Sequence, residues 1–190
     1  MKSPIQKIAQ YSALVAGAAA VLPIACKKDA DMGDPNITVN NLNLTLQNAP
    51  ADSQLISDFD IDNDGTKDFE LYLSSYAPYY GDFVSKLGSN QVLKFYIDGN
   101  NFLRSIPYGQ AIADTSVIWG NFGRGSLIDV GKNDGWAGDG DIYSGVRFYI
   151  GAELHYGWIR YNVAADGKKI TLKDAAYDIR ANTPIKAGAK

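Results

Sequence analysis

The stretch VRFYIGAELHYGWIRYNV, residues 146–163, decides the fold class that this sequence predicts. Every second residue from Val146 to Ile150 is apolar, which is the period of a half-buried β-strand. A short break at Gly151-Ala152-Glu153 follows, and the run that continues to Val163 is rich in aromatic and β-branched side chains, as strands are. The stretch therefore predicts a β-hairpin that turns at this break.

The same period of two recurs at residues 42–46, 69–73 and 170–172. Nineteen glycines supply the positive φ angles that tight turns need. We therefore expect an all-β fold, arranged as an antiparallel, jelly-roll-like β-sandwich. A short helical turn is expected within residues 81–88. Turns are expected at Asp98-Gly99-Asn100-Asn101, Asp134-Gly135, Gly138-Asp139-Gly140 and Asp166-Gly167.

Residues 1–25 have the features of a secretory signal peptide. Lys2 and Lys7 give a positive N-terminal region, and an apolar stretch follows up to Ala25. This stretch contains polar residues and is interrupted by Pro23, so it is a poor membrane-spanning helix, which needs about 20 mostly apolar residues. A retained N-terminal anchor helix is the alternative to a cleaved leader.

Cys26, the only cysteine of the chain, directly follows this apolar stretch. The segment Leu22-Pro23-Ile24-Ala25-Cys26 resembles a lipobox, although Pro23 stands where the motif usually has leucine. We expect cleavage before Cys26 and a lipid on that cysteine that anchors the chain to a membrane; an unmodified thiol is the alternative. In the Gram-negative lipoproteins that this segment resembles, an aspartate directly after the lipidated cysteine retains the protein at the inner membrane. That position is Lys27 here. The outer membrane is therefore favoured, facing the periplasm or the cell surface.

The remaining sequence divides into a tether and one domain. Residues 26–36 are polar with glycine and proline, as flexible linkers are, and residues 37–190 are long enough for a single domain with a core. Removal of residues 1–25 would take away two lysines and lower the formal net charge from −3 to −5. This acidic balance argues against a nucleic-acid partner, which requires a basic patch.

The segment DIDNDGTKD, residues 60–68, is the sharpest chemical feature of the sequence. Carboxylates at loop positions one, three and five can converge on one hard cation, and Gly65 at position six permits a sharp turn. The carbonyl oxygen at position seven and the carboxylate at position nine can complete most of the ligand set. The segment therefore predicts a Ca²⁺ site formed by Asp60, Asp62, Asp64, Thr66 and Asp68.

This loop departs from an EF-hand, because position twelve is Leu71 and the residues that follow predict a strand instead of a helix. A missing ligand must come from elsewhere, and Asp139 and Asp141 are candidates. A metal-free acidic turn is the alternative, since aspartate, asparagine and glycine are common turn residues. Magnesium is less favoured because it requires strict octahedral geometry, and transition metals lack their usual ligands here.

Three later segments carry a resemblance to a group of exported proteins. They are YSGVRF (residues 143–148), HYGWIR (residues 155–160) and ITLKDAAY (residues 170–177). Together with the acidic loop, their order resembles uncharacterised exported β-proteins of bacteria with PEP-CTERM or similar sorting tails. The resemblance covers about residues 58–73 and 143–187, and it implies export and a calcium loop but no activity. The chain ends at Lys190 without a sorting tail, so a lipid would be its anchor.

The aromatic residues of the hairpin are expected to be structural. Tyr156 and Trp158 share one face of their strand, where a core position is more common than a ligand platform. Gly157 between them would let a neighbouring backbone approach closely. His155, the only histidine, is expected to be a hydrogen-bonded structural residue and not a catalyst.

These features favour a non-enzymatic cell-envelope lipoprotein with a calcium-stabilised β domain, whose envelope protein partner, if it has one, is unidentified. The main alternative is an extracellular glycan-binding module, by analogy with other β-sandwich modules, with Tyr76, Tyr79 and Tyr80 as glycan contacts. A glycoside hydrolase-like enzyme is less favoured, because no nucleophile motif is present and no carboxylate pair stands out beyond the acidic loop.

Overall fold

The computed structural model describes residues 33–76, 80–86, 90–97, 100–114, 118–120, 125–129 and 134–190. The expected leader, Cys26, Tyr79 and Asp98-Gly99 lie outside these residues. Within them the chain forms strands and turns but no helix, and so no helix that could span a membrane. The predicted all-β fold with antiparallel sheets is confirmed.

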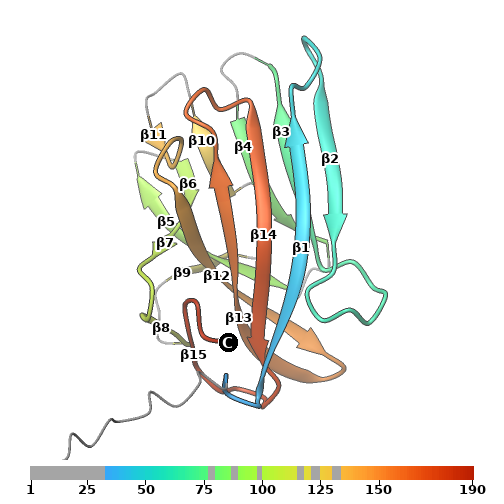
Figure 1. Ribbon diagram of the computed structural model, residues 1–190, viewed down its shortest axis with the longest axis vertical. Coiled ribbons are helices and arrows are strands. Elements are labelled where there is room, and N and C mark those ends of the chain that lie inside the picture. The colour runs from blue at the N-terminus through green and yellow to red at the C-terminus, as the bar shows by residue number, and fades with distance from the viewer. Residues whose placement is uncertain are drawn as a thin grey trace, which may run out of the picture. The chain divides into compact units, whose positions relative to one another are not determined.

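The described residues form fifteen strands, which Figure 1 shows in chain order from blue to red. They are β1 (Ile37–Gln47), β2 (Gln54–Phe59), β3 (Phe69–Ser74), β4 (Tyr80–Ser85), β5 (Gln91–Ile97), β6 (Asn100–Leu103), β7 (Ser105–Ile106), β8 (Ala111–Ile112), β9 (Ile118–Gly120), β10 (Gly125–Asp129), β11 (Asp134–Gly135), β12 (Asp141–Ile150), β13 (Glu153–Val163), β14 (Lys169–Asp178) and β15 (Ile185–Lys186).

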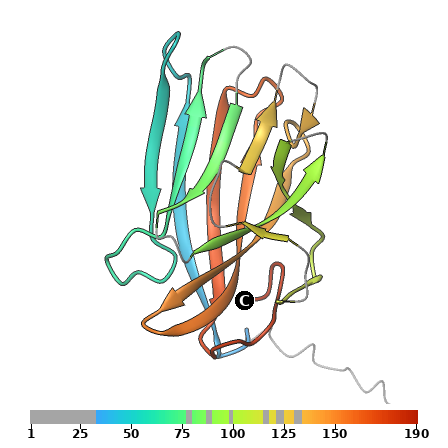
Figure 2. The ribbon, with the colours of Figure 1, turned by 180° about the vertical axis from the view of Figure 1, so that it is seen from behind.

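Most of these strands belong to one hydrogen-bonded path, in the order β1-β14-β13-β12-β5-β6-β10-β4-β3-β2, with β7, β9 and β11 attached to it. Neighbours are antiparallel except β6 and β10, which pair in parallel, and β8 and β15 form a separate small sheet. The two ends of the path, β1 and β2, lie side by side in Figure 1 and in the reverse view of Figure 2. The sheet thus turns back toward itself as one continuous path, and the finer arrangement as a jelly-roll-like sandwich stays a prediction.

The main core lies between the two ends of this path. Strands β2 and β3 and the loop between them contribute Phe59, Ile61, Phe69, Leu71 and Leu73, and strands β12, β13 and β14 contribute Ile142, Val146, Phe148, Ile159, Tyr161, Val163, Ile170, Leu172, Ala175 and Tyr177. Full burial of a side chain such as leucine or phenylalanine contributes about 1.5–3 kcal/mol. Apolar burial therefore holds β2 and β3 against β12–β14, with which they share no backbone pairing.

Strand β13 is buried on both faces. Tyr156 and Trp158 are 3% and 0% exposed, and they belong to a second cluster with residues of β7, β8 and β15. Ile159 and Tyr161, which point the other way, enter the main core. The prediction that Tyr156 and Trp158 share one face as core residues is confirmed.

The predicted hairpin is formed by β12 and β13, which pair in continuous register across a two-residue turn of Gly151 and Ala152. Gly151 has a φ of 61°, in the left-handed region that favours glycine. A Cβ added at Gly157 would lie 2.7 Å from the carbonyl oxygen of Ala176 in β14. The close backbone approach expected at Gly157 is therefore also confirmed.

Two local predictions are wrong. Residues 80–85 form strand β4, paired with β3 and β10, where the sequence predicts a helical turn within residues 81–88. Asp134-Gly135 forms β11 against β10 and not a turn. In both places pairing with a neighbouring strand overrides a weak local preference. The turns at residues 138–140 and 166–167 are confirmed, and their glycines have positive φ.

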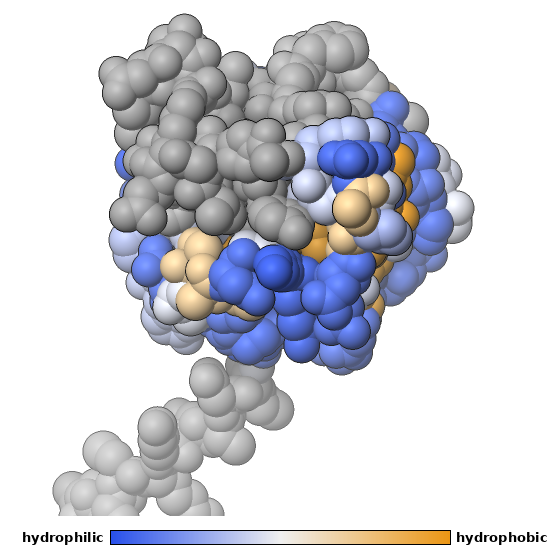
Figure 3. All heavy atoms as spheres, turned by 90° about the horizontal axis from the view of Figure 1, so that it is seen from above, coloured by the Kyte–Doolittle hydropathy of each residue, from blue (hydrophilic) through white to orange (hydrophobic). Residues whose placement is uncertain are grey.

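The exposed large apolar side chains of the described residues come from separate segments of the chain. Figure 3 shows one end of the domain, where the described residues are mostly hydrophilic and the hydrophobic patches between them are small. The large apolar side chains that are exposed belong to six different segments: Val39, Ile56, Tyr76, Tyr108, Tyr149 and Ile179. Among the described residues, the polar clusters are therefore the better candidates for a functional site.

Candidate metal site

The acidic loop, residues 60–68, joins β2 to β3 at the point where their pairing begins. Phe59 and Phe69 are register partners, and their rings stack with centroids 5.7 Å apart. The backbone N–H of Asp68 donates to the carbonyl oxygen of Phe59 at 3.1 Å, which closes the loop. Asp60 and Asp68, the first and last residues of the loop, are brought together by this closure.

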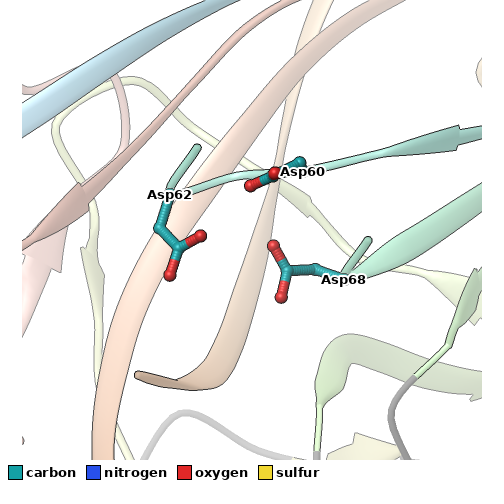
Figure 4. A group of neighbouring side chains, drawn as sticks. All are labelled: Asp60, Asp62 and Asp68. Atoms are coloured by element: carbon teal, nitrogen blue, oxygen red, sulfur yellow. The ribbon is translucent and has the colours of Figure 1, made fainter. Parts of the chain in front are cut away.

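Three carboxylates of the loop converge. Oxygen atoms of Asp60, Asp62 and Asp68 all lie within 4.8 Å of one another. Figure 4 shows the three carboxylates pointing toward a common centre, with Asp60 and Asp68 at the ends of β2 and β3. Asp60 is 8% exposed and Asp68 is 3% exposed, while Asp62 is half-buried. This triad could hold a metal ion.

The loop backbone is wrapped around Asp60. Oδ1 of Asp60 accepts the backbone N–H of Asn63 at 2.6 Å, and Oδ2 of Asp60 accepts the backbone N–H of Gly65 at 2.9 Å. Asn63 and Gly65 have φ angles of 61° and 93°, so the sharp turn predicted at Gly65 is present. Asn40 of β1 supports the loop from outside, because its Nδ2 donates to the carbonyl oxygen of Asp60 and to Oδ1 of Asn63, both at 3.0 Å.

Asp68 is held by donors on both oxygens. Oδ2 accepts the backbone N–H of Ile61 at 2.8 Å, and Oδ1 accepts Nδ2 of Asn90 at 3.2 Å. The pKa of Asp68 is raised to about 6, chiefly by burial and also by the Asp62 and Asp60 carboxylates, while the two hydrogen bonds oppose the shift. Burial likewise raises the pKa of Asp62, and its neighbours Asp60 and Asp64 add to that increase against the hydrogen bond from the Asp64 N–H.

The negative charge of the triad is not balanced by the basic residues that the structure describes. None of the ion pairs found between described residues involves the three carboxylates. Lys86, whose backbone N–H donates to the carbonyl oxygen of Asp68, instead pairs through its side chain with Asp58 at 2.7 Å and with Glu70 at 2.9 Å. Crowded carboxylates with raised pKa values and no basic partner are costly to ionise, and a bound cation would offset that cost.

The other predicted ligands do not join the triad. Asp64 and Thr66 are exposed, and Oδ1 of Asp64 accepts the N–H of Thr66 at 2.6 Å in a local turn. Asp139 is exposed in the turn before β12, and Asp141, the first residue of β12, forms ion pairs with Arg160 and Lys173. The part of β12 that reaches Asn90 is eight residues further on, a span of about 26 Å at 3.3 Å per residue.

Asn40 and Asn90 contact the site although no sequence pattern identifies them. Both are neutral amides from segments outside the loop, and only the folded structure brings them to it. Asn90 is fully buried. Burial of an asparagine outside a turn is the feature that marks Asn90 as unusual. Burial is not visible in the sequence, so inspection of the sequence could not select this residue.

The remaining predicted residues occupy other parts of the domain. Tyr76, at the end of β3, is 47% exposed, and the side chains of Tyr79 and Tyr80 lie outside the described part of the chain. His155 is 3% exposed, and its Nδ1 lies 2.9 Å from the carbonyl oxygen of Asp178, to which it can only donate. This hydrogen bond is the structural role expected for His155.

Comparison with known proteins gives no family to which the chain can be assigned. No family model matches the sequence, and neither a curated protein nor a solved structure matches it. The functional argument therefore rests on the acidic triad and its surroundings.

Proposed function

We propose that this chain is a non-enzymatic cell-envelope lipoprotein whose β domain is stabilised by Ca²⁺ bound in the acidic loop. The observation that carries the metal part is the convergence of Asp60, Asp62 and Asp68, two of them almost fully buried, without a basic partner among the described residues. Charged groups are rarely buried unless they are paired or bind a metal.

The spacing of the triad suits calcium. Two oxygens that bind one Ca²⁺ at about 2.3–2.6 Å lie no more than about 5 Å apart. The spread of 4.8 Å across the triad falls within that limit. Calcium takes six to eight oxygens in flexible geometry, so water or the exposed Asp64 and Thr66 can complete the set. Zinc would instead require histidine or cysteine, and the chain's one histidine is hydrogen-bonded elsewhere.

The role proposed for the cation is stability. The loop joins two strands that supply core residues, so a cation that fixes the loop also supports the packing of β2 and β3. A ligand that binds only the folded state adds about 2.7 kcal/mol at a hundredfold excess over its Kd. The envelope location is supported by the leader-like N-terminus and Cys26.

Calorimetry and thermal melts of the purified protein test the metal proposal. We expect saturable Ca²⁺ binding with one site, and a melting temperature several degrees higher in calcium than in EDTA. Mg²⁺ at the same concentration should give a smaller shift. Absence of both heat and shift with Ca²⁺ would rule out the proposed calcium site.

A further inference from the structure

Asn90 joins two elements that are distant in sequence. It lies directly before β5 and is fully buried. Its Nδ2 donates to Oδ1 of Asp68 at 3.2 Å, and its Oδ1 accepts the backbone N–H of Tyr149 at 3.3 Å. Since a backbone N–H can only donate and a carboxylate can only accept, these two partners fix which end of the amide faces which group.

The side chain of Asn90 extends the sheet by one hydrogen bond. Strands β5 and β12 pair at Gln91 and Arg147, and Gln91 is the first residue of β5. At the preceding residue, the side-chain oxygen of Asn90 accepts the backbone N–H of Tyr149, where a backbone carbonyl of a longer strand would otherwise do so. Tyr149 lies two residues before the turn of the β12–β13 hairpin. The hairpin end is thereby connected to the acidic loop through one buried side chain.

We propose that Asn90 is the positioning residue of the cation site, which holds the Asp68 carboxylate in its ligating orientation and couples cation binding to the end of the β12–β13 hairpin. This inference rests on the calcium site proposed above. Asn90 and the N–H of Ile61 each hold one oxygen of Asp68, so the carboxylate cannot rotate freely. Because a carboxylate offers about four lone-pair sites, two remain for the cation.

The coupling follows from the burial of this link. A cation that binds Asp68 fixes the position of its carboxylate and so restrains Asn90, and Asn90 in turn holds the N–H of Tyr149. Outer hydrogen-bond partners of metal ligands typically change affinity by about 10–100-fold when they are removed. Loss of the Asn90 amide should therefore weaken calcium binding although Asn90 does not itself bind the ion.

Calorimetry on the Asn90→Ala variant tests this proposal. We expect the Kd for Ca²⁺ to rise about tenfold or more relative to the unmodified protein. Ser144→Ala is the matched control, because Ser144 is also buried and hydrogen-bonded, but its partners Arg104 and Tyr161 lie outside the acidic loop. Ser144→Ala should lower the melting temperature in EDTA while leaving the Kd for Ca²⁺ unchanged.

Hydrogen exchange on the unmodified protein provides a second readout that needs no variant. Calcium should slow exchange of the Tyr149 amide more than that of the Ala187 amide, which donates to Gln110 next to the second cluster. The proposal is overturned if Asn90→Ala binds Ca²⁺ as tightly as the unmodified protein, or if calcium slows both amides equally. If the unmodified protein binds no Ca²⁺, the proposed function fails as well, so the two failures give different results.

Discussion

The backbone N–H of Ile61 donates to Oδ2 of Asp68 at 2.8 Å, and this hydrogen bond ties the candidate metal site to the core. Ile61 is fully buried in the main core, although it is only the second residue of the loop. The backbone that holds Asp68 is therefore fixed by apolar packing. Because folding has already gathered Asp60 and Asp68, a cation needs to reorder little of the loop in order to bind.

Asp62→Asn should raise stability without calcium and reduce the response to calcium. In the free loop the pKa of Asp62 is raised by burial and by its acidic neighbours, so a neutral side chain of the same shape relieves that unfavourable ionisation. Asparagine keeps an oxygen for the N–H of Asp64. We expect a higher melting temperature in EDTA and a Kd for Ca²⁺ at least about tenfold weaker.

Asp139→Asn is the control for this substitution. Asp139 is exposed in a turn outside the triad, so its neutralisation should change neither the melting temperature in EDTA nor the Kd for Ca²⁺. A loss of calcium affinity in Asp139→Asn as large as that in Asp62→Asn would show that net charge, and not the triad, governs binding.

Without calcium, the stability of the domain should fall as the pH rises from about 4 to 6. Burial raises the pKa of Asp68 to about 6 in the folded state, above its ordinary value of 3.8, so the folded protein binds more protons than the unfolded chain in this window. The contribution of Asp68 is therefore fully present below about pH 4 and lost above about pH 6. Asp62 acts in the same direction.

Calcium should reverse this dependence, because it binds the ionised carboxylates and its stabilising effect grows as they deprotonate. Melting temperatures at pH 4.5 and pH 7, in metal-free buffer and in excess Ca²⁺, measure both effects. Asp178, whose pKa is lowered by its hydrogen bonds to Arg180, contributes only below this window. A metal-free melting temperature that rises between pH 4.5 and 7 would contradict the effect assigned to Asp68.

The part of the fold that could be predicted is the part whose pairing is local. The β12–β13 hairpin follows from alternation on both sides of a glycine turn, and both signals lie within one short stretch. Strand β4 could not be recognised although its pairing with β3 is local, because Gly81 and Asp82 disfavour a strand and only the pairing with β3 and β10 makes them one. The pairing of β1 with β14 joins the two ends of the domain, and nothing local in either strand specifies it.

The same distinction applies to the site. The spacing of Asp60, Asp62 and Asp68 predicts their convergence, because all three lie in one loop. The spacing also predicts Asp64 as a ligand, but the Asp64 carboxylate instead accepts the N–H of Thr66. Asn90 could not be predicted at all, since it is a neutral residue brought to the loop by the β5–β12 pairing.

Gly157→Ala should destabilise the domain by about 1–3 kcal/mol, which corresponds to roughly 2–10 °C in melting temperature. The new Cβ would lie 2.7 Å from the carbonyl oxygen of Ala176, 3.2 Å from Cγ2 of Val146 and 3.3 Å from Cβ of Tyr177, so β13 and β14 would have to separate. Thermal melts of Gly157→Ala and the unmodified protein measure this cost. An unchanged melting temperature in Gly157→Ala would contradict the steric explanation.

Cys26→Ser should release the protein from the membrane if a lipid on this cysteine is its anchor. A serine cannot carry the thioether-linked lipid, so in a host with lipoprotein processing we expect the unmodified protein in the membrane fraction and Cys26→Ser unprocessed or soluble. Mass spectrometry of the membrane fraction should show cleavage before Cys26 and the added mass of a lipid. Pro23→Leu is the matched variant, because it restores the usual lipobox leucine and should increase the processed fraction. An unmodified Cys26 in a chain that fractionates as a soluble protein would contradict the lipid anchor while leaving the calcium site untouched, since the triad belongs to the folded domain and not to the leader.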